Sequence, residues 1–212
     1  DDLVDYPNTP NSIPEHKVDF VVEVESVGDS SKIASGAIRD TKNPRDILLA
    51  QQAAKVIINS GYFKDGFSIQ TGSGGASLAA VKFIRESMIE KGIKANYALG
   101  GITAHMVKMH EEGLIKRLID VQSFDKVAAE SVKNNEFHKE VSASEYAAAD
   151  EQGSATHYLD IVILSALEVD VDFNVNVLVG SDGIIRGAIG GHPDTAADSA
   201  LSIIVCPLLR GR

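Results

Sequence analysis

The chain has 212 residues, 44% of them hydrophobic and 24% charged, which suits a globular protein with a sizeable core. Twenty Lys and Arg against thirty Asp and Glu leave a net charge of −10, so a nucleic-acid partner is disfavoured. The longest uncharged apolar stretches, 161–167 and 201–209, are too short to cross a bilayer, which argues against a membrane protein. A single cysteine, Cys206, cannot form an intramolecular disulfide, and this predicts a cytoplasmic protein. Its apolar neighbours predict a buried core position.

The first residues predict an arm or linker. The chain begins with Asp1-Asp2 instead of Met, and we expect it to be a piece of a longer protein. Residues 5–14 contain three prolines and cannot form regular structure. Residues 18–27 are rich in β-branched side chains and partly alternate, which predicts a first strand with one face in water. We therefore divide the chain into an arm with this strand, 1–40, and a domain, 41–212.

Helical and strand patterns alternate through the domain. The expected helices are 44–60, 75–91, 102–112 and 125–134, and the expected strands between them are 67–70, 94–99 and 115–122. A buried strand at 159–165, short strands at 174–179 and 183–185, a helix ending at 200 and a strand at 201–205 complete the chain. This order predicts an α/β fold with a mostly parallel sheet flanked by helices, whose ligands bind at the carboxyl ends of the strands.

The turn Gly72-Ser73-Gly74-Gly75, between a strand and a helix, is the sharpest chemical signal. Glycines allow a ligand to approach the backbone, and the first turn of the helix offers N–H groups to an anion or oxyanion. The dinucleotide fingerprint would need a third glycine where Ser77 stands, and no phosphate-loop lysine follows. The turn thus predicts a site for an acyl or phosphate group, although a structural turn before a helix would have the same sequence.

Other candidate residues are weaker. The loop Gly190-Gly191-His192 is a second glycine turn, in which the imidazole could equally be a helix cap or lie in water. Glu145 and Glu168 have apolar or small neighbours and are candidate acids or nucleophiles, with capping or hydrogen bonding as the alternative role. The histidines show no ligand spacing, so we expect no structural metal site.

Several longer strings give the chain a resemblance to the citrate lyase alpha chain family. They are IQTGSGGASLA (69–79), LGGIT (99–103), DVQSFD (120–125), LSALEVD (164–170), FNVNV (173–177), GSDG (180–183), RGAIGGHPDTA (186–196) and PLLRGR (207–212). The resemblance extends over most of the chain. It implies a fold of the CoA-transferase type (NagB/RpiA/CoA transferase), of which this chain resembles the second of two halves.

The resemblance also implies an activity, transfer of citrate onto an acyl-carrier-protein thioester with release of acetate. The implied partners are a beta chain that cleaves citryl thioester and a gamma chain that carries a CoA-derived prosthetic group. No cofactor is then bound tightly by this chain, and magnesium is compatible with the whole complex. The implied catalytic residues are Gly72, Gly74 and Gly75, whose backbone would stabilise an oxyanion. The implied substrate- or CoA-binding residues are Ser73, Gly100, Gly101, Arg186, Gly190, Gly191 and His192.

One departure from the wider CoA-transferase superfamily concerns the nucleophile. The commonest class has a glutamate on the strand after the glycine turn, whereas residues 94–99 read KANYAL and contain no carboxylate. The resemblance to the citrate lyase class implies transfer through a mixed anhydride without an acyl-enzyme, and the missing glutamate agrees with this. Glu145 is the fallback nucleophile. Two alternatives remain: another acyl-CoA transferase or thioester hydrolase that uses Glu145 or Glu168, and a half that mainly docks other subunits.

Overall fold

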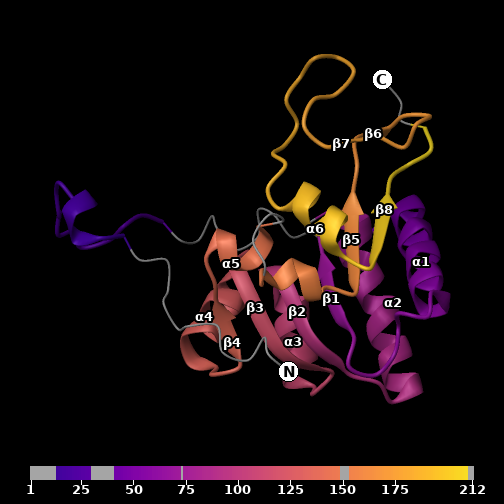
Figure 1. Ribbon diagram of the computed structural model, residues 1–212, viewed down its shortest axis with the longest axis horizontal. Coiled ribbons are helices and arrows are strands. Elements are labelled where there is room, and N and C mark those ends of the chain that lie inside the picture. Colours follow the sequence, from indigo (N-terminus) through magenta and orange to yellow (C-terminus); the bar gives the residue numbers. More distant parts are fainter. Residues whose placement is uncertain (1–12, 30–40, 73, 149–152, 210–212) are drawn as a thin grey trace.

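The computed structural model describes residues 13–29, 41–72, 74–148 and 153–209 (Figure 1). Its α-helices are α1 (Pro44–Asn59), α2 (Gly75–Lys91), α3 (Ala104–Glu111), α4 (Lys126–Asn134), α5 (Ala143–Ala147) and α6 (His192–Asp198), with 3₁₀ turns η2 (Glu15–Lys17) and η4 (Ala155–Tyr158). Its strands are β1 (Ser68–Thr71), β2 (Ala95–Ile102), β3 (Ile115–Ser123), β4 (His138–Glu140), β5 (Ile161–Ser165), β6 (Glu168–Val169), β7 (Val175–Asn176) and β8 (Leu201–Val205).

Six of the strands form one parallel sheet in the order β4-β3-β2-β1-β5-β8, which confirms the predicted α/β architecture. The chain builds the sheet outward from β1 to β4 and then returns to the other side of β1 with β5. Strand order therefore reverses between β1 and β5. In open α/β sheets such a switch point opens a crevice at the carboxyl ends of the strands, where ligands bind.

Helices cover both faces of this sheet, and the alternation of side chains along each strand decides which face they reach. Ile161 and Ile163 of β5 join a core with α1, α2, α3 and α4. Val162 and Leu164 of the same strand point the other way, into a second core with α5 and η4. Ala196 of α6 packs against this second core. Among the described residues, the helices over the second face are short, and Figure 1 shows α5 and α6 near the ends of the strands.

The glycine pair that we expected in a turn after the second strand is part of the strand itself. β2 continues through Gly100 and Gly101 to Ile102, and its register with β3 shifts between the two glycines. Such a bulge adds a residue without ending the strand, so glycine was a poor stop signal here. The short strand β4 and helix α5 were not predicted, because segments of three and five residues carry too little periodicity.

The predicted strand at 18–27 is wrong. Apart from η2, the described residues from 13 to 29 form neither helix nor strand, and Phe20, Val21 and Val22 are exposed. A β-branched segment becomes a strand only when another strand accepts its hydrogen bonds, and no described strand pairs with it. The segment is drawn in indigo, away from the sheet (Figure 1). The division into an arm and a domain stays a prediction.

The expectation that Cys206 is a buried core residue is also wrong. It directly follows β8, the edge strand of the sheet, and its side chain is only partly buried. Apolar neighbours in sequence indicated burial, but an edge strand has a neighbour on one side only. Among the described residues, no helix is long and apolar enough to cross a membrane.

Candidate active site at the carboxyl ends of the strands

A cavity of about 310 Å³ lies at the switch point, over the carboxyl ends of β1, β2, β3 and β5. Its walls come from the strand ends, the turn before α2, helix α5 and the loop that leads into α6. The residues that line it are Gln70, Thr71, Gly72, Gly74, Gly101, Val121, Gln122, Phe124, Tyr146, Leu164, Ser165, Val177, Ala188, Ile189, Gly190, Gly191 and His192. The position of the cavity at the switch point and its lining of mostly backbone and uncharged groups fit a site for a small acid or acyl group.

The glycine turn predicted from the sequence forms one wall of this cavity. The N–H of Gly72 donates to the carbonyl oxygen of Ile163 over 2.7 Å, which ties the turn to β5. Gly74 is the N-cap of α2 and has no side chain with which to cap it. Because the first-turn N–H groups of a helix have no intrahelical acceptor, they are available to an anionic ligand here. Ser73 lies outside the described residues.

Glycine at position 74 is required by a close neighbour and not by its backbone angles. Its φ of −70° is ordinary for any residue. However, a Cβ at this position would lie 3.1 Å from the Cβ of Ser165 and still closer to its hydroxyl. The Ser165 hydroxyl lies 2.9 Å from that of Ser77, so the turn, β5 and α2 are joined at this point. Gly75 differs, since it does not line the cavity and its Cβ would contact Thr41 at an ordinary 3.5 Å.

Gly101 of β2 faces the cavity and lies against the ring of Phe124, where a Cβ would overlap the ring. Gly100 has a φ of +102°, a conformation that favours glycine, and packs against the Gln70 amide. Gly100 does not line the cavity itself. The two glycines that we predicted to bind substrate thus shape the site through the side chains that they accommodate.

Gln70 of β1 and Tyr146 of α5 meet inside the cavity, and neither was predicted. The Gln70 Nε2 donates to the Tyr146 hydroxyl oxygen over 2.6 Å, and both residues are more than nine-tenths buried. Burial raises the pKa of Tyr146; the hydrogen bond from Gln70 opposes this, and the charge of Asp194 adds to it. The phenol is therefore a neutral hydrogen-bond donor at ordinary pH.

The second predicted loop, Gly190-Gly191-His192, closes the cavity from the α6 side. His192 is the first residue of α6, and its Nε2 donates to the carbonyl oxygen of Ser165 over 3.2 Å. Gly191 lies against Tyr146, and Gly190 has a φ of +49°. The imidazole is the only group in the described lining that can carry a positive charge.

Three predicted polar residues lie outside the cavity lining. Arg186 is half-exposed and its guanidinium pairs with Asp182, four residues earlier. The Glu145 carboxylate accepts a hydrogen bond from the backbone N–H of Ser142 over 2.8 Å and completes a capping box at α5. Glu168 accepts hydrogen bonds from the backbone of Ser181 and the amide of Asn176. Hydrogen bonding by the side chains of Ser181 and Asn176 holds the pKa of Glu168 below the ordinary value.

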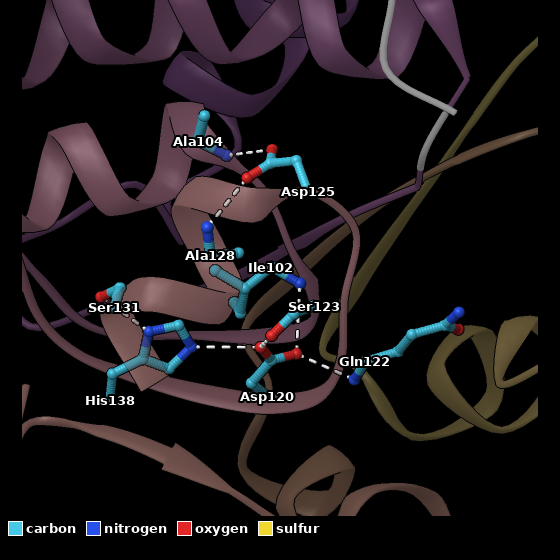
Figure 2. A network of polar contacts seen from close by, with 9 residues as sticks. All are labelled: Ile102, Ala104, Asp120, Gln122, Ser123, Asp125, Ala128, Ser131 and His138. Atoms are coloured by element: carbon cyan, nitrogen blue, oxygen red, sulfur yellow. Dashed lines mark hydrogen bonds and ion pairs between the residues drawn. The ribbon is translucent and has the colours of Figure 1, made fainter. Parts of the chain in front are cut away.

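A buried carboxylate fixes the ends of β2 and β3 beside the cavity (Figure 2). Asp120 accepts hydrogen bonds from the Gln122 N–H at 2.8 Å and the Ser123 hydroxyl at 2.6 Å, and a longer one of 3.4 Å from Ile102. The Nε2 of buried His138 lies 3.2 Å from the same carboxylate. This cluster holds the strand ends that carry Gly101, Gln122 and Phe124 to the cavity.

Three further polar contacts, one to His138 and two to Asp125, lie beside this cluster (Figure 2). The other ring nitrogen of His138 lies 2.9 Å from the hydroxyl of Ser131, on α4. Asp125 caps α4 by accepting from Ala128 and also accepts from Ala104 at the start of α3. The helices that follow β2 and β3 therefore begin in fixed positions. Among the described residues, no three His, Cys, Asp or Glu side chains gather as ligands for a metal ion.

Comparison with known proteins identifies the family. The family model for the citrate lyase alpha subunit matches residues 1–212. The citrate lyase alpha chains of Haemophilus influenzae and Escherichia coli are 59% and 58% identical over the whole chain, which spans 42% of each relative. The crystal structure of the alpha subunit of citrate lyase from Streptococcus mutans, in complex with citrate, superposes with a TM-score of 0.88 at 56% identity, covering 98% of this chain and 41% of that one. On this match, the chain belongs to the citrate lyase alpha subunit family.

Proposed function

We propose that this chain forms an acyl-transfer site of a citrate lyase alpha chain, a CoA-transferase-type enzyme that exchanges acetate for citrate on a carrier thioester. The observation that carries the proposal is the cavity at the switch point, where the Gly72–Gly74 turn and the uncapped start of α2 face a space of about 310 Å³. The S. mutans relative has a bound citrate, which supports citrate as the acid.

The proposed reaction has two steps and needs no protein nucleophile. A carboxylate oxygen of citrate attacks the carbonyl carbon of the acetyl thioester, the C–S bond breaks, and a thiolate and a citryl–acetyl anhydride form. The thiolate then attacks the citryl carbonyl, and acetate leaves with the bridging oxygen. The described residues that line the cavity include no Asp or Glu, which supports direct transfer between substrates.

The chain's own contribution is to position the substrates and stabilise charge. Negative charge develops on the carbonyl oxygen in each tetrahedral intermediate, and the backbone N–H of Gly74, which lines the cavity, would donate to it. His192, whose Nε2 donates to the carbonyl oxygen of Ser165, would supply positive charge beside the cavity when its ring is protonated. Ser73 and Arg186 stay candidate binding residues, the latter for a part of the substrate or carrier outside the cavity.

We further propose that the thioester reaches the site on a CoA-derived prosthetic group of a separate acyl-carrier gamma chain. A beta chain would then cleave the citryl thioester, and the complex would act in the cytoplasm. The thiol arm of such a carrier would have to reach the cavity at the carboxyl ends of the strands.

The proposal is tested by incubating the complete alpha chain that contains this sequence with acetyl-CoA, with and without citrate. We expect acetate release to require citrate and citryl-CoA to accumulate, as detected by mass spectrometry. Equal release of acetate without citrate would indicate a thioester hydrolase. Transfer to other acids but not to citrate would indicate a different acyl-CoA transferase, and no reaction in the assembled complex would contradict the proposal.

Glu145→Ala should retain most transferase activity, because Glu145 caps α5 and does not line the cavity. Loss of the capping box should reduce the free energy of unfolding by about 1 kcal/mol, measured by urea unfolding. Ser142→Ala removes the reciprocal half of the same box and should have the same two effects. A reduced Glu145 adduct, trapped by borohydride from acetyl-CoA alone, together with an inactive variant, would instead establish a covalent mechanism.

A further inference from the structure

The paired side chains of Gln70 and Tyr146 are the polar feature of the cavity that the proposed transfer does not use. They come from β1 and α5, 76 residues apart, and touch through a hydrogen bond of 2.6 Å. Both line the cavity and both are almost completely buried. A polar pair in such a place is either satisfied by the protein or arranged for a ligand.

The described protein leaves this pair incompletely satisfied. The Gln70 Oε1 is buried and accepts no hydrogen bond, and no described hydrogen bond uses the hydrogen of the Tyr146 hydroxyl. Beyond their mutual bond, the two side chains thus offer one unpaired acceptor, the Gln70 Oε1, and as donors the hydrogen of the Tyr146 hydroxyl and the second Nε2 hydrogen. Turning the amide over also leaves both an acceptor and donors open, since Tyr146 then donates to Oε1, and its own oxygen and the Nε2 hydrogens stay unpaired.

Two of the predicted glycines make room for this pair. A Cβ at Gly100 would lie 2.8 Å from the Gln70 Cδ, and one at Gly191 would lie 2.5 Å from the Tyr146 Cε1. Both separations are too short for real contacts. The backbone of β2 and of the loop before α6 therefore approaches the pair from two sides and keeps it at the cavity.

The unpaired hydrogen-bond donors and acceptor of Gln70 and Tyr146 determine which chemical group of a ligand the pair can bind. A carboxylate only accepts hydrogen bonds and would face the unpaired acceptor with repulsion, whereas an alcohol hydroxyl both donates and accepts. We propose, on the basis of the function above, that Gln70 and Tyr146 bind the hydroxyl group of the acceptor acid and make the site specific for hydroxy acids. Because burial raises the pKa of Tyr146, its donor persists at neutral pH.

The assignment is tested with citrate and tricarballylate, which is citrate without its hydroxyl. Binding of each acid to the complete alpha chain is measured by calorimetry. We expect citrate to bind at least about tenfold more tightly, because an analogue without the hydroxyl leaves buried polar groups unpaired. Tyr146→Phe and Gln70→Met should each weaken citrate binding by about tenfold and leave tricarballylate binding nearly unchanged. Tyr158→Phe and Gln51→Met, which alter exposed residues outside the cavity, should change neither affinity.

Equal affinity of the unaltered chain for the two acids, binding of neither, or equal loss of both in the variants would overturn the assignment. Thermal unfolding of each variant confirms that it is folded, and either substitution alone suffices for the test. Turnover separates the two proposals. A chain that prefers citrate in binding but transfers no acyl group contradicts the proposed function only. A chain that transfers both acids equally well contradicts the hydroxyl site only.

Discussion

Gly74→Val should slow transfer from acetyl-CoA to citrate by about a hundredfold, equivalent to about 3 kcal/mol of transition-state stabilisation, as when one oxyanion donor is lost. Any side chain at this position meets Ser165, whose Cβ lies 3.1 Å from the place of a new Cβ. Valine adds two methyl groups to this contact, so we expect the turn to shift away from β5 and the N–H groups at the start of α2 to shift with it. Steady-state kinetics on the complete chain measure the effect, with thermal unfolding as the check on folding.

The cause of this effect can be isolated with a second substitution. Gly74→Ala adds only the Cβ and should produce a smaller loss, and Ser165→Gly in the same chain removes the atoms that it meets. We expect Gly74→Ala to reduce the transfer rate less in a chain that carries Ser165→Gly than in the unaltered chain. Each alanine variant is compared with the chain that keeps Gly74 and has the same residue at position 165. Additive losses would show that the steric contact is not the cause. Near-normal turnover of a folded Gly74→Val chain would remove the turn from the catalytic site.

The sheet and the glycine turn could be predicted from the sequence because both depend on local signals. The apolar spacing of residues 44–59 and 75–91 gives helices with one buried face, and glycine marks both ends of the second. Strand-to-helix turns in a parallel sheet all lie at the same edge. Gly72 lies at that edge after β1, and the loop with Gly190 reaches the same cavity, although 118 residues separate the two glycines in the chain.

The polar side chains of the site could not be predicted, because their role depends on contacts between distant segments. Gln70 alternates with apolar residues in a strand, and its sequence context gives no sign of a partner. Tyr146 lies on a helix of five residues, too short to show which side faces the sheet. The glycines gave an indirect signal, since Gly100 and Gly191 exist where these two side chains need space.

The prediction of a strand at 18–27 was wrong because a strand, like the polar pair, depends on a partner elsewhere in the chain. Its β-branched composition is a property of the segment, but a strand is a property of two segments that exchange hydrogen bonds. Arg186 shows the limit of motif reasoning about charge, because its guanidinium lies beside Asp182 and outside the cavity lining. The Asp120 cluster could not be predicted from the sequence either, because its members come from separate strands and loops.

Asp120→Ala should reduce the free energy of unfolding by about 3 kcal/mol, a drop in Tm of about 6–12 °C for a domain of this size. The carboxylate is buried, and its removal leaves His138, the Ser123 hydroxyl and the Gln122 N–H without their acceptor (Figure 2). Urea unfolding of the variant and the unaltered chain measures the loss.

The matched control is Asp170→Ala. That carboxylate also accepts several hydrogen bonds, from Asp172 and Asn174, which hold its pKa below the ordinary value. It lies in an exposed loop between β6 and β7, where water takes over the donors, so stability should hardly change. Since the Asp120 cluster also fixes Gln122 at the cavity, Asp120→Ala should raise the KM for citrate below its lowered Tm, and Asp170→Ala should not. Equal stability of the two variants would show that burial of the cluster contributes nothing, and an unchanged KM would separate the cluster from the site.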